Sequence, residues 1–160
     1  MSNGIKVKKR DGRIESLDLD KMHLMVDEAC QGLAGVSASQ VEMKSGIQFY
    51  DGITTEEIQE ILIKAASDLI DLDHPNYQFV AARLLLFALR KQLYGKMREL
   101  PHLEPHIMNC TNIDVYDKEI FAKYSKEEID KANSFIDHDR DFLFTYAGLR
   151  QVVDKYLVQD

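Results

Sequence analysis

The start of the chain changes from a two-residue to a helical hydrophobic repeat. Apolar and polar residues alternate in IKVKK (5–9) and in RIESL (13–17), and an Asp-Gly pair lies between them. This pattern predicts a β-hairpin with a type I′ turn. Beyond Asp18, a capping residue, the apolar spacing i, i+3, i+4, i+7, i+8, i+11 predicts an amphipathic helix with the stripe Met22, Met25, Val26, Ala29, Cys30 and Leu33.

Three more helices are predicted by capping residues at their starts and by turn residues at their ends. Two begin with capping boxes, Ser-x-x-Gln and Thr-x-x-Glu, and the third has a proline in its first turn. The third contains FVAARLLLFALR, which is apolar nearly all round and typical of a helix enclosed by others. Their expected bounds are 37–51, 54–72 and 75–95. A mainly α unit with a small β cap is thus predicted over residues 1–95.

The rest of the chain, residues 96–160, predicts a second helical segment. KMRELPHLEPH has two closely spaced prolines and is typical of a linker. Helices are then expected over 103–110, 117–123, 125–136 and 142–157. The final KYLVQD is apolar and strand-like without a terminating residue, so we expect the fold to be truncated there.

The distribution of charge narrows the choice of ligand. The chain has a net charge of −7, which argues against a general nucleic-acid binder. Two basic islands nevertheless interrupt the acidic background. Residues 1–13 hold five Lys or Arg and a single acid, and residues 76–98 hold five and no acid. A solvated face is the usual explanation, but two separate islands indicate a small anionic ligand.

Several classes of protein are disfavoured by what the sequence contains. Its apolar runs are far shorter than the ~20 residues of a membrane span, and charged residues from Lys6 onward disfavour a signal peptide. Cys30 and Cys110 give neither a disulfide framework nor a metal-ligand spacing, which fits a reducing cytoplasm. We find no Gly-rich phosphate loop and no nucleophile elbow.

Two histidine-containing stretches invite a metal interpretation that we reject. DHDRD (137–141) offers several possible ligands, but their spacing is too crowded for one helix face, so we expect helix capping and an Asp–Arg140 pair. His102 and His106 are four residues apart, but Pro105 disturbs that turn. We therefore assign no metal site.

Three groups of residues are candidates for binding an anion. Lys9 and Arg10 lie at a hairpin turn, and a helix N-terminus follows the hairpin. Basic side chains and a helix start are the parts of a phosphate site. The alternative is that the lysines protect the edge of the hairpin. Thr55 and Gln59 share one helix face, or are simply a cap and a surface amide. Lys91 lies near a helix end, where a cation also complements the helix dipole.

Four blocks of the sequence resemble the N-terminus of the large (α) subunit of class Ia ribonucleotide reductase. They occur in the family's order and extend over essentially the whole chain: VKKRDGRIESLDLDKM, SQVEMKSGIQFYDGITTEEIQEILIKAASDLI, PNYQFVAARLLLFALRKQLYG and FIDHDRDFLFTYAGLRQVVDKYLVQ. Residues 1–95 look like the ATP cone, the family's allosteric domain, in which a small sheet covers a helix bundle. Residues 96–160 look like the start of the helical N-terminal part of the catalytic domain.

The resemblance implies a function for the parent protein and a narrower one for this segment. The parent would reduce ribonucleoside diphosphates to deoxyribonucleotides by a radical route, using active-site cysteines outside this segment and a radical-generating small (β) subunit. This segment would bind ATP or dATP, with Mg²⁺, and hold no cofactor for chemistry. ATP would activate the enzyme, and dATP would inhibit it by promoting an inhibited α/β assembly. A cytoplasmic protein with self-associating large subunits is implied, without nucleic-acid or membrane partners.

The resemblance also assigns roles to individual residues. Lys9 and Arg10 would face the phosphates, Thr55 would bond a phosphate from its helix start, and Lys91 would close the site. The base and sugar would be lined by Glu15, Ser16, Leu17, Asp18, Leu19, Asp20 and Lys21. Both basic islands would thus converge on one triphosphate.

Position 59 departs from the family pattern. Many bacterial relatives have a histidine there that reaches the phosphates, whereas this chain has Gln59, an amide that can donate a hydrogen bond but carries no charge. We expect nucleotide binding to survive and the dATP response to be weakened. ATP and dATP differ by one hydroxyl, so residues 15–21, near the ribose, would have to discriminate between them.

Two other functions remain as alternatives. A stand-alone ATP-cone regulator would pair the cone with a zinc ribbon, which two isolated cysteines cannot build. A degenerate cone that only mediates subunit contacts would not be stabilised by ATP, whereas a functional one would be.

Overall fold

The computed structural model describes residues 4–157. Contacts divide the chain into two units. The first contains the residues up to Leu89 and those from Phe142 onward, and the second is Arg90–Asp141. The division into domains 1–95 and 96–160 stays a prediction.

The first unit begins with a small sheet whose middle strand is β1, Lys6–Lys8. β2, Ile14–Ser16, pairs with β1 antiparallel, and β3, Ile53–Thr54, pairs with it parallel on the other side. The predicted hairpin is therefore confirmed. β3 was not predicted, because two residues are too few to show an alternating pattern. Val7 and Ile53 face each other in the register and are both buried.

The hairpin turn differs from the expected type I′. The N–H of Gly12 donates to the carbonyl of Lys9 (2.9 Å), and the N–H of Lys9 donates to the carbonyl of Arg13 (2.8 Å). Gly12 has a φ of +84°, but Asp11 lacks the positive φ that a type I′ turn at the Asp-Gly pair would require. The predicted turn type is wrong. Arg10, Asp11 and Gly12 form a three-residue loop with glycine in the left-handed position.

Four helices follow: α1 Leu19–Cys30, α2 Ala38–Gly46, α3 Thr55–Ser67 and α4 Tyr77–Tyr94. Their predicted N-caps are confirmed at Asp18, Ser37 and Thr54, and the box of Thr54 with Glu57 is complete. The predicted ends are too late for two of them. α2 ends at Gly46 and α3 at Ser67, because short i→i+3 turns follow each helix instead of continued helical bonds.

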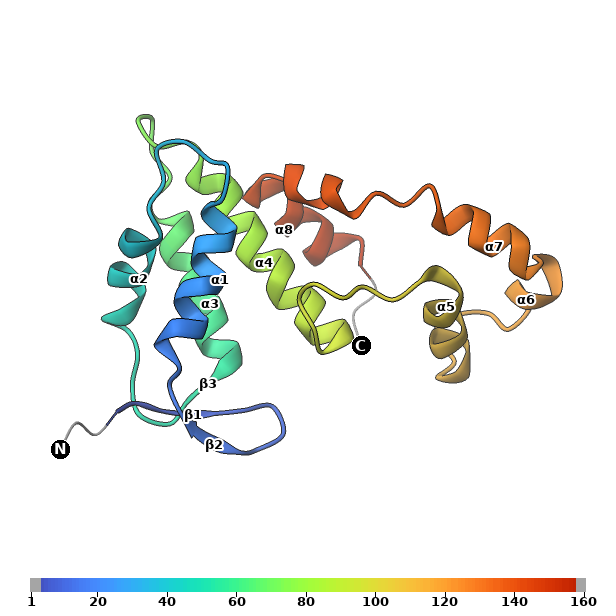
Figure 1. Cartoon of the computed structure of the whole chain (residues 1–160), viewed down its shortest axis with the longest axis horizontal. Helices are drawn as coiled ribbons and strands as arrows, with labels where there is room; N and C mark the ends of the chain where they lie inside the picture. The colour runs from blue at the N-terminus through green and yellow to red at the C-terminus, as the bar shows by residue number, and fades with distance from the viewer. Residues whose placement is uncertain (1–3, 158–160) are drawn as a thin grey trace. The chain divides into compact units, whose positions relative to one another are not determined.

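The buried core of the first unit lies among these helices. Figure 1 shows the sheet at the end of the bundle where α1 and α3 begin. α2 packs against both α1 and α3. α4 is buried over most of its circumference, as its apolar sequence predicts, through Val80, Ala81, Ala82, Leu84, Leu85, Leu86 and Phe87. The mainly α fold with a small sheet is thus confirmed.

The C-terminal part of the chain is helical as predicted: α5 Leu103–Asn112, α6 Ile120–Lys123, α7 Lys126–Asn133, the 3-10 helix His138–Leu143 and α8 Tyr146–Lys155. In the second unit α5 packs on α7, and Arg90 donates to Asp141 (2.7 Å). Asp141 therefore pairs with Arg90, and among the described residues Arg140 forms no ion pair with an Asp of this stretch, so the expected Asp–Arg140 pair is wrong. Within residues 4–157, no helix is long and apolar enough to cross a membrane. Of the strand-like run predicted over 155–160, the last three residues lie outside the described residues, and Lys155 is still part of α8.

Candidate functional site

The hairpin turn presents two candidate phosphate-binding cations, and each already faces a carboxylate. The ammonium of Lys9 lies 3.4 Å from Glu15, across the hairpin. The Nε of Arg10 donates to Oε1 of Glu56, in the first turn of α3. The turn is therefore joined by charge to a helix start that is distant in sequence.

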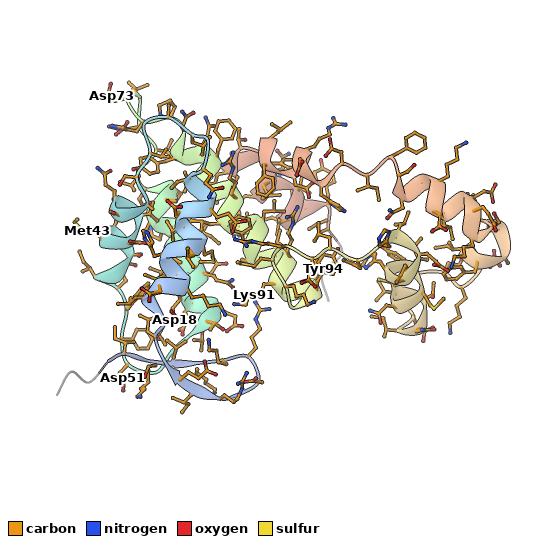
Figure 2. All side chains as sticks on the ribbon, in the orientation of Figure 1. Asp18, Met43, Asp51, Asp73, Lys91 and Tyr94 are labelled. Carbon is orange, nitrogen blue, oxygen red and sulfur yellow. The ribbon has the colours of Figure 1, made fainter. Side chains whose placement is uncertain are left out.

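The residues between β2 and α1 form a continuous edge of the same unit. Asp18 caps α1 by accepting a hydrogen bond from the N–H of Lys21 (2.9 Å), and Figure 2 shows it at the start of α1. The N–H of Leu17 donates to the carbonyl of Ile5 (2.8 Å), which ties this segment to the strand before it. Leu19, in the first turn of α1, is 60% exposed, as is Leu24 on the same helix at 65%.

The start of α3 supplies hydroxyl and amide donors. Thr55 is the first residue of α3, and its hydroxyl donates to Oε2 of Glu56 (3.1 Å). Gln59 lies one turn further along, is 7% exposed, and its Nε2 has no hydrogen-bond partner. A buried donor without an acceptor is costly. Among the described residues, Nε2 of Gln59 and Nε of Arg83 are the buried side-chain polar atoms without a partner.

β3 explains why the hairpin and α3 meet. Lys8 pairs in register with Thr54, so the strand that leads into the turn lies next to the residue that caps α3. The N–H of Lys6 also donates to Asp51 (2.8 Å), which Figure 2 shows beside the sheet. The structure thus brings Arg10 and Thr55 to one carboxylate, that of Glu56, and Lys9 to Glu15 of β2. Gln59 lies one helical turn from Thr55 on the same helix.

Lys91 is placed differently from the other predicted residues. It lies in the last turn of α4 and belongs to the second unit. α4 itself contributes to both units, because its first part belongs to the first unit. The role of Lys91 as a phosphate ligand stays a prediction.

Glu56 is the residue that sequence reasoning missed. Burial pushes the pKa of Glu56 upward, but hydrogen bonds from its own backbone N–H, Arg10 and Thr55 outweigh this, so the pKa lies below its ordinary value. Glu56 is therefore an anion at neutral pH. An acid in a first helical turn is ordinary in sequence, and only the pairing of β3 with β1 reveals that it meets Arg10.

No cluster of three or more His, Cys, Asp or Glu within residues 4–157 is arranged to hold a metal ion. Asp137, the first residue of the DHDRD stretch, instead accepts a hydrogen bond from the N–H of Asp139 (3.1 Å), which is the capping role expected of it. The side chains of Lys9, Arg10, Thr55 and Gln59 are donors, a set suited to an anion, and Glu15 and Glu56 are the carboxylates that face three of them.

Comparison with known families decides the classification. The family model of the ATP cone domain matches residues 5–92, which include the sheet and α1–α3 in full. The chain belongs to the ATP-cone family. The matched stretch contains every predicted site residue, including Lys91, so the candidate site lies wholly within the ATP cone.

The whole chain, and not only the cone, is similar to larger proteins. It is 49% identical over 160 residues to the ribonucleoside-diphosphate reductase 1 subunit alpha of Escherichia coli and 47% identical over 160 residues to subunit alpha of Haemophilus influenzae. It is also 43% identical over 158 residues to subunit alpha of Enterobacteria phage T4. The chain spans about a fifth of the length of these relatives (20–21%), in their N-terminal region.

Proposed function

We propose that the ATP cone of this chain binds ATP or dATP and acts as the nucleotide-sensing region of a ribonucleoside-diphosphate reductase large subunit. The triphosphate, with Mg²⁺, would lie between the hairpin turn and the start of α3. The base and sugar would lie along residues 15–21. Lys91 would add a further cation from α4.

The contact of one carboxylate with both Arg10 and Thr55 carries this proposal. The family resemblance assigns both residues to the phosphates, and Glu56 accepts from both at once. Carboxylate and phosphate oxygens are recognised by the same charge-assisted donors. The N-terminus of α3 adds the positive end of a helix dipole. The arrangement is therefore suited to holding an anion.

The parent enzyme's activity follows from similarity alone. Relatives named as ribonucleoside-diphosphate reductase alpha subunits support reduction of ribonucleoside diphosphates by the longer protein, with a radical-generating small subunit as partner. ATP would activate that enzyme, and the inhibition by dATP through an altered assembly of large and small subunits would be weakened by Gln59. The cytoplasm is the proposed location, since the chemistry depends on reduced cysteines.

Titration with nucleotides tests the sensing role. ATP and dATP should each raise the melting temperature of the chain, because a ligand that binds only the folded state stabilises it by mass action. Lys9→Gln should weaken ATP binding about tenfold in calorimetry, the effect of losing one charge-assisted contact. Lys64→Gln is the matched control, since Lys64 is also an ion-paired lysine but pairs with Asp68 at the far end of α3 (2.9 Å).

Two outcomes would contradict the proposal. If neither nucleotide shifts the melting temperature at millimolar concentration, the cone is degenerate and a role in subunit contacts is the better account. If Lys9→Gln and Lys64→Gln weaken ATP binding equally, the hairpin turn does not hold the phosphates.

A further inference from the structure

Glu56 occupies the position where the proposed function needs an anion. Its two carboxylate oxygens are divided between the two elements of the site. Oε1 accepts from Arg10 of the hairpin, and Oε2 accepts from the Thr55 hydroxyl at 3.1 Å. A phosphate group bound to the same two donors would need this space and would be repelled by this charge.

The neighbouring glutamate shows that Glu56 is not simply the acid that complements the helix dipole. Glu57 fills that role, because its Oε2 accepts from the N–H of Thr54 at 2.8 Å and from the Thr54 hydroxyl at 2.9 Å in the capping box. Glu57 also accepts from the Tyr50 hydroxyl (2.7 Å). Glu56 takes no part in that capping box and instead contacts Arg10 and Thr55. Two of its contacts are therefore with residues assigned to the phosphate site.

A second, independent feature, the unsatisfied amide of Gln59, indicates that the site fits an anion larger than one carboxylate. The amide Nε2 of Gln59 is buried, has no acceptor, and lies on the helix face of Thr55. Glu56 satisfies Arg10 and Thr55 but leaves this donor unsatisfied. A chain of phosphates extends further than a single carboxylate, so it can reach Gln59 as well as the two donors that Glu56 contacts.

We propose that Glu56 is an internal competitor for the phosphates of the nucleotide. In the free protein its carboxylate holds Arg10 and Thr55, and it leaves them when a triphosphate binds. This inference rests on the proposed nucleotide site and adds a residue that sets its affinity. The exchange favours ligands with several phosphates, because only these replace both contacts of Glu56 and also reach Gln59.

The competitor has a specific effect on ligand choice. Adenosine carries no phosphate and does not displace the carboxylate, so its binding is independent of Glu56. ATP and inorganic tripolyphosphate must displace it, so both bind less tightly than they would without the charge. The ion pair is partly exposed, with side chains 36% and 44% accessible, so the competition is of modest size.

Glu56→Gln tests the inference because it removes the charge and keeps the shape. Calorimetric titration of the full chain should show ATP and tripolyphosphate binding roughly three- to tenfold more tightly, the range expected for loss of one exposed ion pair and of its repulsion toward phosphate. Adenosine binding should stay unchanged. Glu56→Ala should act in the same direction, which guards against a hydrogen bond retained by the glutamine.

Glu60→Gln is the matched control. Glu60 is an exposed glutamate on the same helix, one turn further on, and the substitution changes the net charge equally. Its effect on ATP affinity should be less than twofold. In an Arg10→Gln background, Glu56→Gln should lose most of its effect, because a double-mutant cycle reports the contact between the two residues.

The outcomes separate the inference from the function on which it rests. If ATP binds and Glu56→Gln leaves its affinity unchanged, Glu56 does not compete. If Glu56→Gln weakens ATP binding, the carboxylate assists the ligand, for example through Mg²⁺, and the inference is wrong while the nucleotide site stands. An equal gain in Glu60→Gln would assign the effect to net charge. If neither the chain nor its variants bind ATP or tripolyphosphate, both proposals fail.

Discussion

The hydroxyl of Tyr77 on α4 accepts a hydrogen bond from the backbone N–H of Ser37 at the head of α2 (3.0 Å). The same hydroxyl donates to the side chain of Gln40 (3.1 Å). The sequence predicts a capping box in which Gln40 itself would reach the N–H of Ser37. Tyr77 stands between them instead, so a buried ring from α4 completes the cap of α2.

Tyr77→Phe should therefore destabilise the protein without altering its fold. The change removes one hydroxyl from a side chain that is 2% exposed and leaves the N–H of Ser37 without its acceptor. We expect the free energy of unfolding to fall by about 1–2 kcal/mol, measured by urea denaturation. Tyr50→Phe is the control, since Tyr50 is 51% exposed and its loss should cost about 0.5 kcal/mol or less. Equal losses would show that Tyr77 does not act through the cap.

Gln59→Leu should separate stability from ligand binding. Removing a buried donor that has no acceptor relieves a cost, so the ligand-free protein should gain about 1 kcal/mol in the free energy of unfolding. The rise in melting temperature caused by ATP should shrink, because the donor that a phosphate would satisfy is gone. Differential scanning calorimetry with and without ATP measures both effects.

The exposed Gln151 on α8 provides the control for that substitution. Gln151→Leu should change the free energy of unfolding by less than about 0.5 kcal/mol and leave the ATP response intact. A Gln59→Leu protein that is less stable but responds fully to ATP would remove Gln59 from the site.

Arg83 should prove to be a structural residue of the first unit. Its Nη1 donates to the carbonyls of Ala29 (3.1 Å) and Gln31 (2.7 Å) at the end of α1, and its guanidinium lies 5.6 Å from the ring centre of Phe142. Arg83→Ala should lower the free energy of unfolding by about 2–3 kcal/mol, because charged hydrogen bonds and a cation–π contact are lost together.

A surface arginine gives the comparison for Arg83. Arg150 forms an i,i+4 pair with Asp154 (3.7 Å), and Arg150→Ala should cost about 0.5 kcal/mol or less. Guanidinium denaturation of both variants decides the matter. Similar losses for the two would mean that Arg83 does not hold the end of α1 to α4.

Cys30 should be unreactive at neutral pH. Burial, and after it the charge of Asp27, raises the pKa of the Cys30 thiol to about 11. At pH 8 the thiolate fraction is then about one in a thousand, roughly a hundredfold less than for an ordinary thiol. In a Cys110→Ser variant, alkylation by iodoacetamide should be correspondingly slow and should accelerate as the pH approaches 11.

The same pKa shift makes a prediction about stability. The folded state binds the thiol proton more tightly than the unfolded state, so this contribution is complete below the ordinary thiol pKa and is lost as the pH rises toward 11. Cys30→Ala should reduce the fall in stability over that alkaline range. A reaction rate for Cys30 equal to that of a small free thiol at pH 8 would contradict both statements.

The sequence predicted the elements of the fold better than their ends. Helical spacing and capping residues such as Asp18 and Thr54 are local, and the structure confirms them. The end of α3 was placed too late because Leu69 continues the apolar stripe beyond Ser67, where the helical bonds have already ended. The turn type was wrong because an Asp-Gly pair fits both a two-residue loop and a three-residue loop with glycine last.

The sequence predicted which residues belong to the candidate site but not how they contact one another. Lys9, Arg10 and Thr55 were selected from charge, capping and family resemblance. The carboxylate that joins Arg10 and Thr55, that of Glu56, could not be selected, because its contact with Arg10 depends on β3 pairing with β1 across a long stretch of chain. The burial of Gln59 depends likewise on packing that no local pattern records.

The parallel pairing of β1 with β3 has a consequence for how the protein is made. The hairpin partner of β1 is synthesised directly after it, but its other neighbour exists only after Ile53 has been synthesised. At translation rates of about 5–20 residues per second, the middle strand waits roughly 2–10 s with one side open. During that interval the nascent chain has an edge that a neighbouring nascent chain could occupy. The hairpin turn can therefore pack against α3 only late in synthesis, when α3 emerges.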